Sequence, residues 1–75
     1  MAGLSLTIEH LDNWFTYHSP TVEQTEAYAK IRDAARSFAE VLLRQTPPSA
    51  DQTAAIRQLR QAVMTANAAI ACSGR

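Results

Sequence analysis

The chain has few of the residues that interrupt helices: of its 75 residues, two are glycine and three are proline. The glycines stand near the two ends, and the prolines at positions 20, 47 and 48 leave two uninterrupted stretches, residues 21–46 and 49–73. Glycine and proline are the strongest local breakers of regular structure, so each stretch can form one long helix. Alanine, the best helix former, occurs 14 times and fills both stretches.

Cysteine and histidine are also scarce. Cys72 is the one cysteine, so no disulfide can form within the chain. The two histidines, His10 and His18, have no cysteine at zinc-site spacing, which argues against a structural metal. A chain this short buries only about 60% of its unfolded surface. With disulfide and metal excluded, oligomerisation is the expected source of stability.

The chain also lacks an excess of charge of either sign and lacks long apolar runs. Seven basic and seven acidic residues give a formal net charge of zero, which disfavours a general binder of polymeric nucleic acid. No apolar run approaches the roughly 20 residues of a membrane span. No signal-peptide pattern is present. With its free cysteine, the chain is expected in a reducing cytoplasm, away from the membrane.

Two helices are predicted, over residues 22–45 and 50–71. Thr21 with Gln24, and Ser49 with Gln52, have the spacing of capping boxes. A start at Ser19, with a proline next to it, competes for the first helix. Because residues 46–49 form a short connector, the helices should run antiparallel. The predicted fold class is all-α: an antiparallel helical hairpin.

Both helices carry an apolar seam and a second row beside it. The seams have 3-4-3-4 spacing, as in a coiled coil: Tyr28, Ile31, Ala35, Phe38 and Leu42, then Ile56, Leu59, Val63, Ala66 and Ile70. The second rows recur every seven residues: Ala27, Ala34 and Val41, then Ala55, Ala62 and Ala69. One partner helix cannot cover such wide stripes, so we expect the hairpin to assemble into a compact homo-oligomer. The alternative is that the alanine rows only fill the helices.

The first residues are ambiguous. Leu4, Leu6 and Ile8 alternate as in a strand, whereas Leu4, Ile8, Leu11 and Phe15 fit one helix face. Residues 1–14 are therefore treated as an N-terminal arm and residues 15–75 as the hairpin domain. Trp14 and Phe15 are large apolar residues that should cover a surface.

Several arginines lack a nearby acid. Arg32 has no acidic residue three or four positions away, whereas Arg36 can reach Glu40. After Asp51 the chain has no acid, which leaves Arg57 and Arg60 without local counter-charge. A guanidinium beside an apolar seam suits phosphate, which it can bind through two hydrogen bonds. The alternative is an ion pair with an acid of another copy, such as Glu23 or Asp33.

No group in the sequence points to catalysis. His18 and Cys72 each lack a sequence neighbour that would make a nucleophile–base pair, and no glycine-rich phosphate loop or metal cluster is present. We therefore expect no enzyme activity and no cofactor. Tyr17, just before the first long helix, can stack on a base or can simply pack at the helix entrance.

Two runs resemble the anti-CBASS protein 2 family of small phage proteins, which sequester cyclic oligonucleotide signals. They are residues 15–20 (Phe-Thr-Tyr-His-Ser-Pro) and residues 59–71 (LRQAVMTANAAIA), with Ile31-Arg32 and Ala34-Ala35 between them. The two runs are specific jointly, although neither alone would be. The resemblance covers residues 15–71, and residues 1–14 find no counterpart.

The resemblance implies a helical hairpin that forms a homohexamer in the cytoplasm of the infected bacterial host. It implies pockets between protomers for cyclic dinucleotides such as cyclic GMP–AMP. It also implies sites nearer the three-fold axis for cyclic trinucleotides such as cyclic tri-adenylate, with neither ligand cleaved. The implied dinucleotide-binding residues are Tyr17, His18, Arg32 and Arg36, and the implied trinucleotide-binding residues are Arg60, Thr65 and Asn67. Arg32 stands where some members carry lysine.

Two hypotheses from other functional classes compete with the cyclic-oligonucleotide sponge. A structural hairpin adaptor would use its apolar rows to bind a partner protein helix, although coiled-coil flanks usually carry both charge signs and the second helix is almost free of acids. A small DNA-binding regulator is weakened by the zero net charge and by the lack of a helix-turn-helix pattern.

Overall fold

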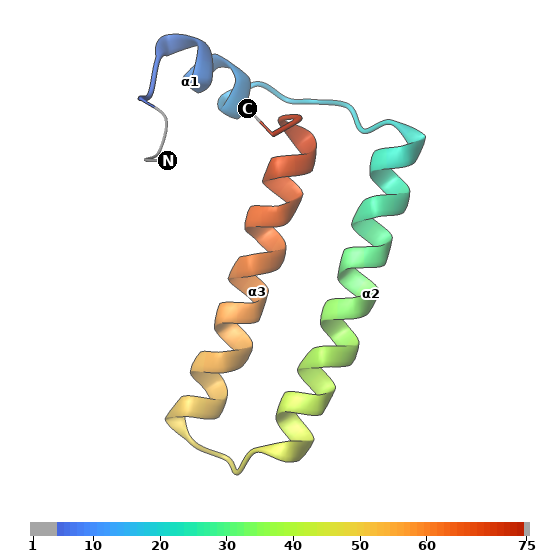
Figure 1. Cartoon of the computed structure of the whole chain (residues 1–75), viewed down its shortest axis with the longest axis vertical. Helices are drawn as coiled ribbons and strands as arrows, with labels where there is room; N and C mark the ends of the chain where they lie inside the picture. The colour runs from blue at the N-terminus through green and yellow to red at the C-terminus, as the bar shows by residue number, and fades with distance from the viewer. Residues whose placement is uncertain (1–4, 75) are drawn as a thin grey trace.

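The computed structural model describes residues 5–74 and contains three helices: α1 (Ile8–Phe15), α2 (Val22–Gln45) and α3 (Ala50–Ala71). Helices α2 and α3 lie side by side and antiparallel, and α1 lies across the end of α3 opposite the connector (Figure 1). No strand occurs among the described residues. The predicted all-α helical hairpin is confirmed.

Both long helices begin and end at the predicted residues. At the start of α2, the Thr21 hydroxyl accepts the Gln24 backbone N–H at 3.1 Å, and the Gln24 side chain accepts the Thr21 N–H at 2.9 Å. This confirms the first capping box and excludes the competing start at Ser19.

The second capping box is only half formed. The Ser49 hydroxyl accepts the Gln52 N–H at 3.1 Å, but the Gln52 side chain turns away from the Ser49 backbone. It donates to the carbonyl oxygens of Leu43 at 3.1 Å and Thr46 at 3.0 Å. The last carbonyls of α2 have no partner within their own helix, so they compete for the Gln52 amide. Gln52 thereby joins the end of α2 to the start of α3.

The ambiguous N-terminal segment forms a helix. Thr7 caps α1 by accepting the His10 N–H at 3.3 Å, and His10 Nδ1 accepts the Thr7 N–H at 3.1 Å. The backbone N–H of Glu9 and the Thr7 hydroxyl together lower the pKa of Glu9, as expected for an acid in the first turn. The expected arm–hairpin border, between residues 14 and 15, falls within α1. Leu4, which took part in both apolar patterns, lies outside the described residues.

The hairpin has no core of its own. None of residues 5–74 is fully buried, and the seam side chains of α2 and α3 are half-buried at best. Phe38 remains 53% exposed and Phe15 84% exposed. A folded chain normally buries its large apolar side chains, so these surfaces are available for contacts with other molecules.

A left-handed turn ends α3. Ser73 has φ of 56°, the Gly74 N–H donates to the Ala69 carbonyl at 2.8 Å, and the Ser73 N–H donates to the Ile70 carbonyl at 3.2 Å. These two bonds define a Schellman motif, whose left-handed position usually holds glycine. Here a serine occupies it and bears the steric cost of its Cβ.

Ser73→Gly is therefore expected to stabilise the protein by about 1 kcal/mol. Thermal unfolding followed by circular dichroism measures the shift in Tm. Ser73→Ala is the control, because it removes the hydroxyl and keeps the Cβ, and it should leave Tm nearly unchanged. A fall in Tm for Ser73→Gly would contradict this reading of the turn.

Candidate functional site

A shallow groove of about 280 Å³ runs between α2 and α3 on one face of the hairpin. Arg32 and Arg36 of α2 and Arg60 of α3 line it. Its other lining residues are almost wholly apolar: Ala35, Ala39, Ile56, Leu59, Val63 and Met64. Arg32 and Arg36, which the resemblance assigned to the dinucleotide, thus share one groove of a single chain with Arg60, which it assigned to the trinucleotide. This groove is hereafter called the arginine groove.

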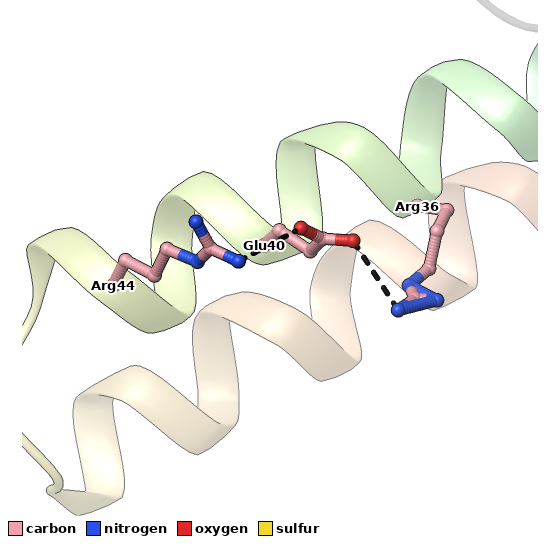
Figure 2. A network of polar contacts seen from close by, with 3 residues as sticks. All are labelled: Arg36, Glu40 and Arg44. Atoms are coloured by element: carbon pink, nitrogen blue, oxygen red, sulfur yellow. Dashed lines mark hydrogen bonds and ion pairs between the residues drawn. The ribbon is translucent and has the colours of Figure 1, made fainter.

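The arginines of this face differ in their partners. Arg36 Nη2 lies 3.2 Å from one carboxylate oxygen of Glu40, and Arg44 Nη2 lies 3.4 Å from the other (Figure 2). The Arg36 and Arg44 side chains are 72% and 76% exposed, and exposed pairs of this kind contribute about 0–1 kcal/mol. Arg36 can therefore exchange Glu40 for another anion at little cost. Within residues 5–74, Arg32 and Arg60 form no ion pair.

Arg57 extends the basic face. It lines one neighbouring hollow with Arg60, Gln61 and Met64, and a second with Leu43, Gln52, Thr53, Ile56 and Arg60. The sequence showed that Arg57 lacks a local acid and shares a helix stripe with Arg60 and Met64, but we assigned it no ligand. That spacing was the available signal, because it places Arg57 one turn from Arg60 on the same face.

Thr65 and Asn67 lie outside the arginine groove. Thr65 is exposed, and its hydroxyl accepts a hydrogen bond from Gln61 Nε2 at 3.4 Å. Asn67 is half-buried, and its Oδ1 is a buried acceptor with no hydrogen-bond partner among the described residues. An unsatisfied buried carbonyl is costly, and in this conformation the oxygen is enclosed by the chain itself.

Tyr17 and His18 lie in the linker between α1 and α2, away from the groove. The Tyr17 side chain is 84% exposed. His18 is half-buried, and its Nε2 donates to the Asn13 carbonyl at 2.6 Å. Arg32 is ten residues into α2 from Val22, which corresponds to about 15 Å along the helix axis. A single chain therefore does not bring Tyr17 and Arg32 to one pocket.

Cys72 and His18 meet at the same atom, which the sequence did not predict. The Cys72 thiol lies 3.9 Å from the Asn13 carbonyl oxygen that also accepts from His18. Both side chains point a hydrogen at that oxygen, so neither is arranged as a base toward the other. Among residues 5–74, no three His, Cys, Asp or Glu side chains group as metal ligands, and no helix has the length and apolar character to cross a membrane.

A family model described as the Acb2/Tad1 hairpin domain matches residues 7–71. The chain belongs to this family. The match includes α1, which the resemblance drawn from the sequence left out. Comparisons with curated proteins and with solved structures gave no match. At the family level, Acb2/Tad1 proteins are phage anti-CBASS cyclic-nucleotide sponges rather than enzymes.

Proposed function

We propose that this Acb2/Tad1 chain binds cyclic oligonucleotides and sequesters them without cleavage in the cytoplasm of the infected bacterium. The observation that carries this proposal is the arginine groove, where Arg32 and Arg60 stand unpaired, within the described chain, around an apolar floor. A guanidinium binds phosphate through a planar fork of donors, and an apolar floor suits the face of a base. A cyclic oligonucleotide carries both phosphates and base faces in one small molecule.

Cyclic dinucleotides such as cyclic GMP–AMP are the first proposed ligand class, with Tyr17, Arg32 and Arg36 as contacts. Since Tyr17 and Arg32 are apart in one chain, the pocket combines them from different copies. A cyclic dinucleotide has two phosphates, and a two-fold-related pair of Arg32 side chains would match it by symmetry. His18 belongs to this site through its neighbour Tyr17.

Cyclic trinucleotides such as cyclic tri-adenylate are the second proposed class, bound by Arg60, Thr65 and Asn67. Arg60 supplies the charge, and the exposed Thr65 supplies a hydroxyl that can donate or accept. Asn67 Oδ1 is buried within the chain, so the Asn67 side chain would have to turn outward to contact the ligand. The three side chains come from less than three turns of α3, so three copies around an axis would present one set to each nucleotide.

A homohexamer is the proposed assembly. A second groove, of about 430 Å³, shares Ala35, Leu59 and Val63 with the arginine groove. Its other lining residues are also apolar: Ile31, Ala34, Phe38, Ala62 and Ala66. It is hereafter called the alanine groove. Its small side chains permit close approach of another helix, and no described residue is fully buried within one chain. A second hairpin in this groove would supply the missing core.

Calorimetric titration with cyclic GMP–AMP and, separately, with cyclic tri-adenylate tests the function. We expect tight binding of both, and intact ligand after heat denaturation and chromatography. A linearised product would show a nuclease. If the protein bound neither ligand, the proposed sponge function would be refuted.

The alternative function is a structural adaptor that binds a partner protein helix. The exposed alanine groove favours it, because an amphipathic helix would fill such a surface. A chain that binds neither nucleotide yet remains monomeric would support the adaptor.

A further inference from the structure

Asn13, near the end of α1, joins three parts of the chain. Its side-chain Nδ2 donates to the Cys72 carbonyl at the end of α3, at 3.3 Å. Its backbone carbonyl accepts the His18 Nε2 at 2.6 Å and lies 3.9 Å from the Cys72 thiol. Asn13 and Cys72 are 59 residues apart in the sequence, and both are half-buried. This set of contacts is hereafter called the Asn13 junction.

The Asn13 junction fixes one end of the linker between α1 and α2, and the first turn of α2 fixes the other end. Gln24, in the first turn of α2, donates from Nε2 to the Ile70 carbonyl at 3.0 Å. The last carbonyls of α3 therefore receive donors from both α1 and α2. Residues 16–21 run between these two attachments, and His18 fixes the linker a third time from within.

Tyr17 lies in this held linker, next to His18. Its ring is 84% exposed, so the fold gives it little support through packing. The position of the Tyr17 backbone is set by the His18–Asn13 bond on one side and by α1 on the other. A ring held in its binding position before the ligand arrives loses less conformational freedom on binding.

We propose that Asn13 is a positioning residue for Tyr17, and that His18 acts on the ligand through Asn13 rather than by contact. The proposal rests on the proposed function, in which Tyr17 contacts a cyclic dinucleotide. A carbonyl oxygen only accepts, so His18 Nε2 carries the hydrogen in this bond. Neutral imidazole can provide it, and so can the amide nitrogen of a glutamine at the same position.

The test measures cyclic GMP–AMP binding by calorimetry for five variants of the full chain, of which one is Tyr17→Ala and one combines Tyr17→Ala with Asn13→Ala. Asn13→Ala and His18→Ala should weaken binding about tenfold, whereas His18→Gln should stay within about twofold of the native chain because it retains the donor. Cyclic tri-adenylate binding should change less than about twofold in all of them, since Tyr17 takes no part in that site. In a Tyr17→Ala background, Asn13→Ala should add no further loss.

Trp14 gives a readout that needs no ligand. It is the one tryptophan of the chain, adjacent to Asn13, and its ring lies 5.8 Å from the His10 ring. Loosening of the junction in Asn13→Ala should lower the fluorescence anisotropy of Trp14 and shift its emission to the red. His18→Gln should leave both unchanged. Circular dichroism and light scattering confirm that each variant is folded and assembled. If Asn13→Ala does not fold, His18→Ala against His18→Gln makes the same comparison with the Asn13 side-chain bond intact.

The outcomes separate this proposal from the function on which it rests. If Tyr17→Ala weakens binding but Asn13→Ala and His18→Ala do not, the positioning role is wrong and the dinucleotide site stands. A full additional loss from Asn13→Ala in the Tyr17→Ala background also overturns it. If Tyr17→Ala leaves the affinity unchanged, the proposed dinucleotide site is wrong, and the positioning role fails with it.

Discussion

Arg32→Ala is expected to lower the affinity for cyclic GMP–AMP about a hundredfold while the assembly stays intact. Truncating one partner of a hydrogen-bonded charge pair that binding buries costs about 2–5 kcal/mol, and every 1.4 kcal/mol is tenfold in affinity. Arg32 forms no ion pair within residues 5–74, so a phosphate has no competing carboxylate to displace. In a two-fold-symmetric pocket, one substitution removes both copies of the contact.

Arg44→Ala is the matched control for Arg32→Ala. It removes the same charge from the same helix, but Arg44 is 76% exposed and does not line the arginine groove. Its affinity should change by less than about threefold. Arg32→Lys should fall between the two, because lysine keeps the charge and loses the planar fork. Calorimetry gives the affinities and light scattering the assembly. Equal affinities for Arg32→Ala and Arg44→Ala would rule out a phosphate contact at Arg32.

Ala62→Glu is expected to abolish assembly and most of the helix content. Ala62 lines the alanine groove, where another copy would enclose the new carboxylate among apolar side chains. Burying an unpaired charge costs several kcal/mol, which exceeds what a small marginal chain can lose. The isolated hairpin has no fully buried residue among those described, so loss of the contact should unfold the chain. Glutamate is itself a good helix former, so the loss would not come from local propensity.

Ala54→Glu is the control for Ala62→Glu. Ala54 is exposed on α3 and does not line either groove. Ala54 is the fifth residue of α3, and glutamate is a good helix former, so this variant should be about as stable as the native chain. Light scattering reports the mass and circular dichroism the helicity. A folded, assembled Ala62→Glu chain would place the contact between copies on another surface.

The long helices could be predicted from the sequence because their signals are local. Proline and glycine bound both stretches, and the Thr21–Gln24 pair marks the start of α2. Helix α1 was ambiguous because Leu4 and Ile8 fit both a strand alternation and a helix face, and eight residues are too few to decide. Gln52 donates to the two carbonyls that the connector brings close to it, and no local sequence pattern indicates which carbonyls those are.

The site was predictable in residue type but not in arrangement. Because they lack nearby acids in the sequence, Arg32, Arg57 and Arg60 could be identified as candidate anion-binding residues. These arginines lie on one face because of how α2 is rotated about its axis relative to α3. Heptad spacing identifies the apolar stripe of each helix but does not fix that rotation. The Asn13 junction was not foreseen at all, because its partners are 59 residues apart and two of its acceptors are backbone carbonyls.

None of residues 5–74 is fully buried, so in the proposed hexamer folding of the chain would be a reaction of several molecules. Its stability then depends on how much protein is present: in the proposed hexamer, each tenfold dilution costs every chain about 1.1 kcal/mol. Unfolding midpoints would rise with protein concentration, and a ligand held between copies would raise them further. If the proposed hexamer forms, the chain would have a threshold concentration, below which it is unfolded and above which binding capacity appears abruptly.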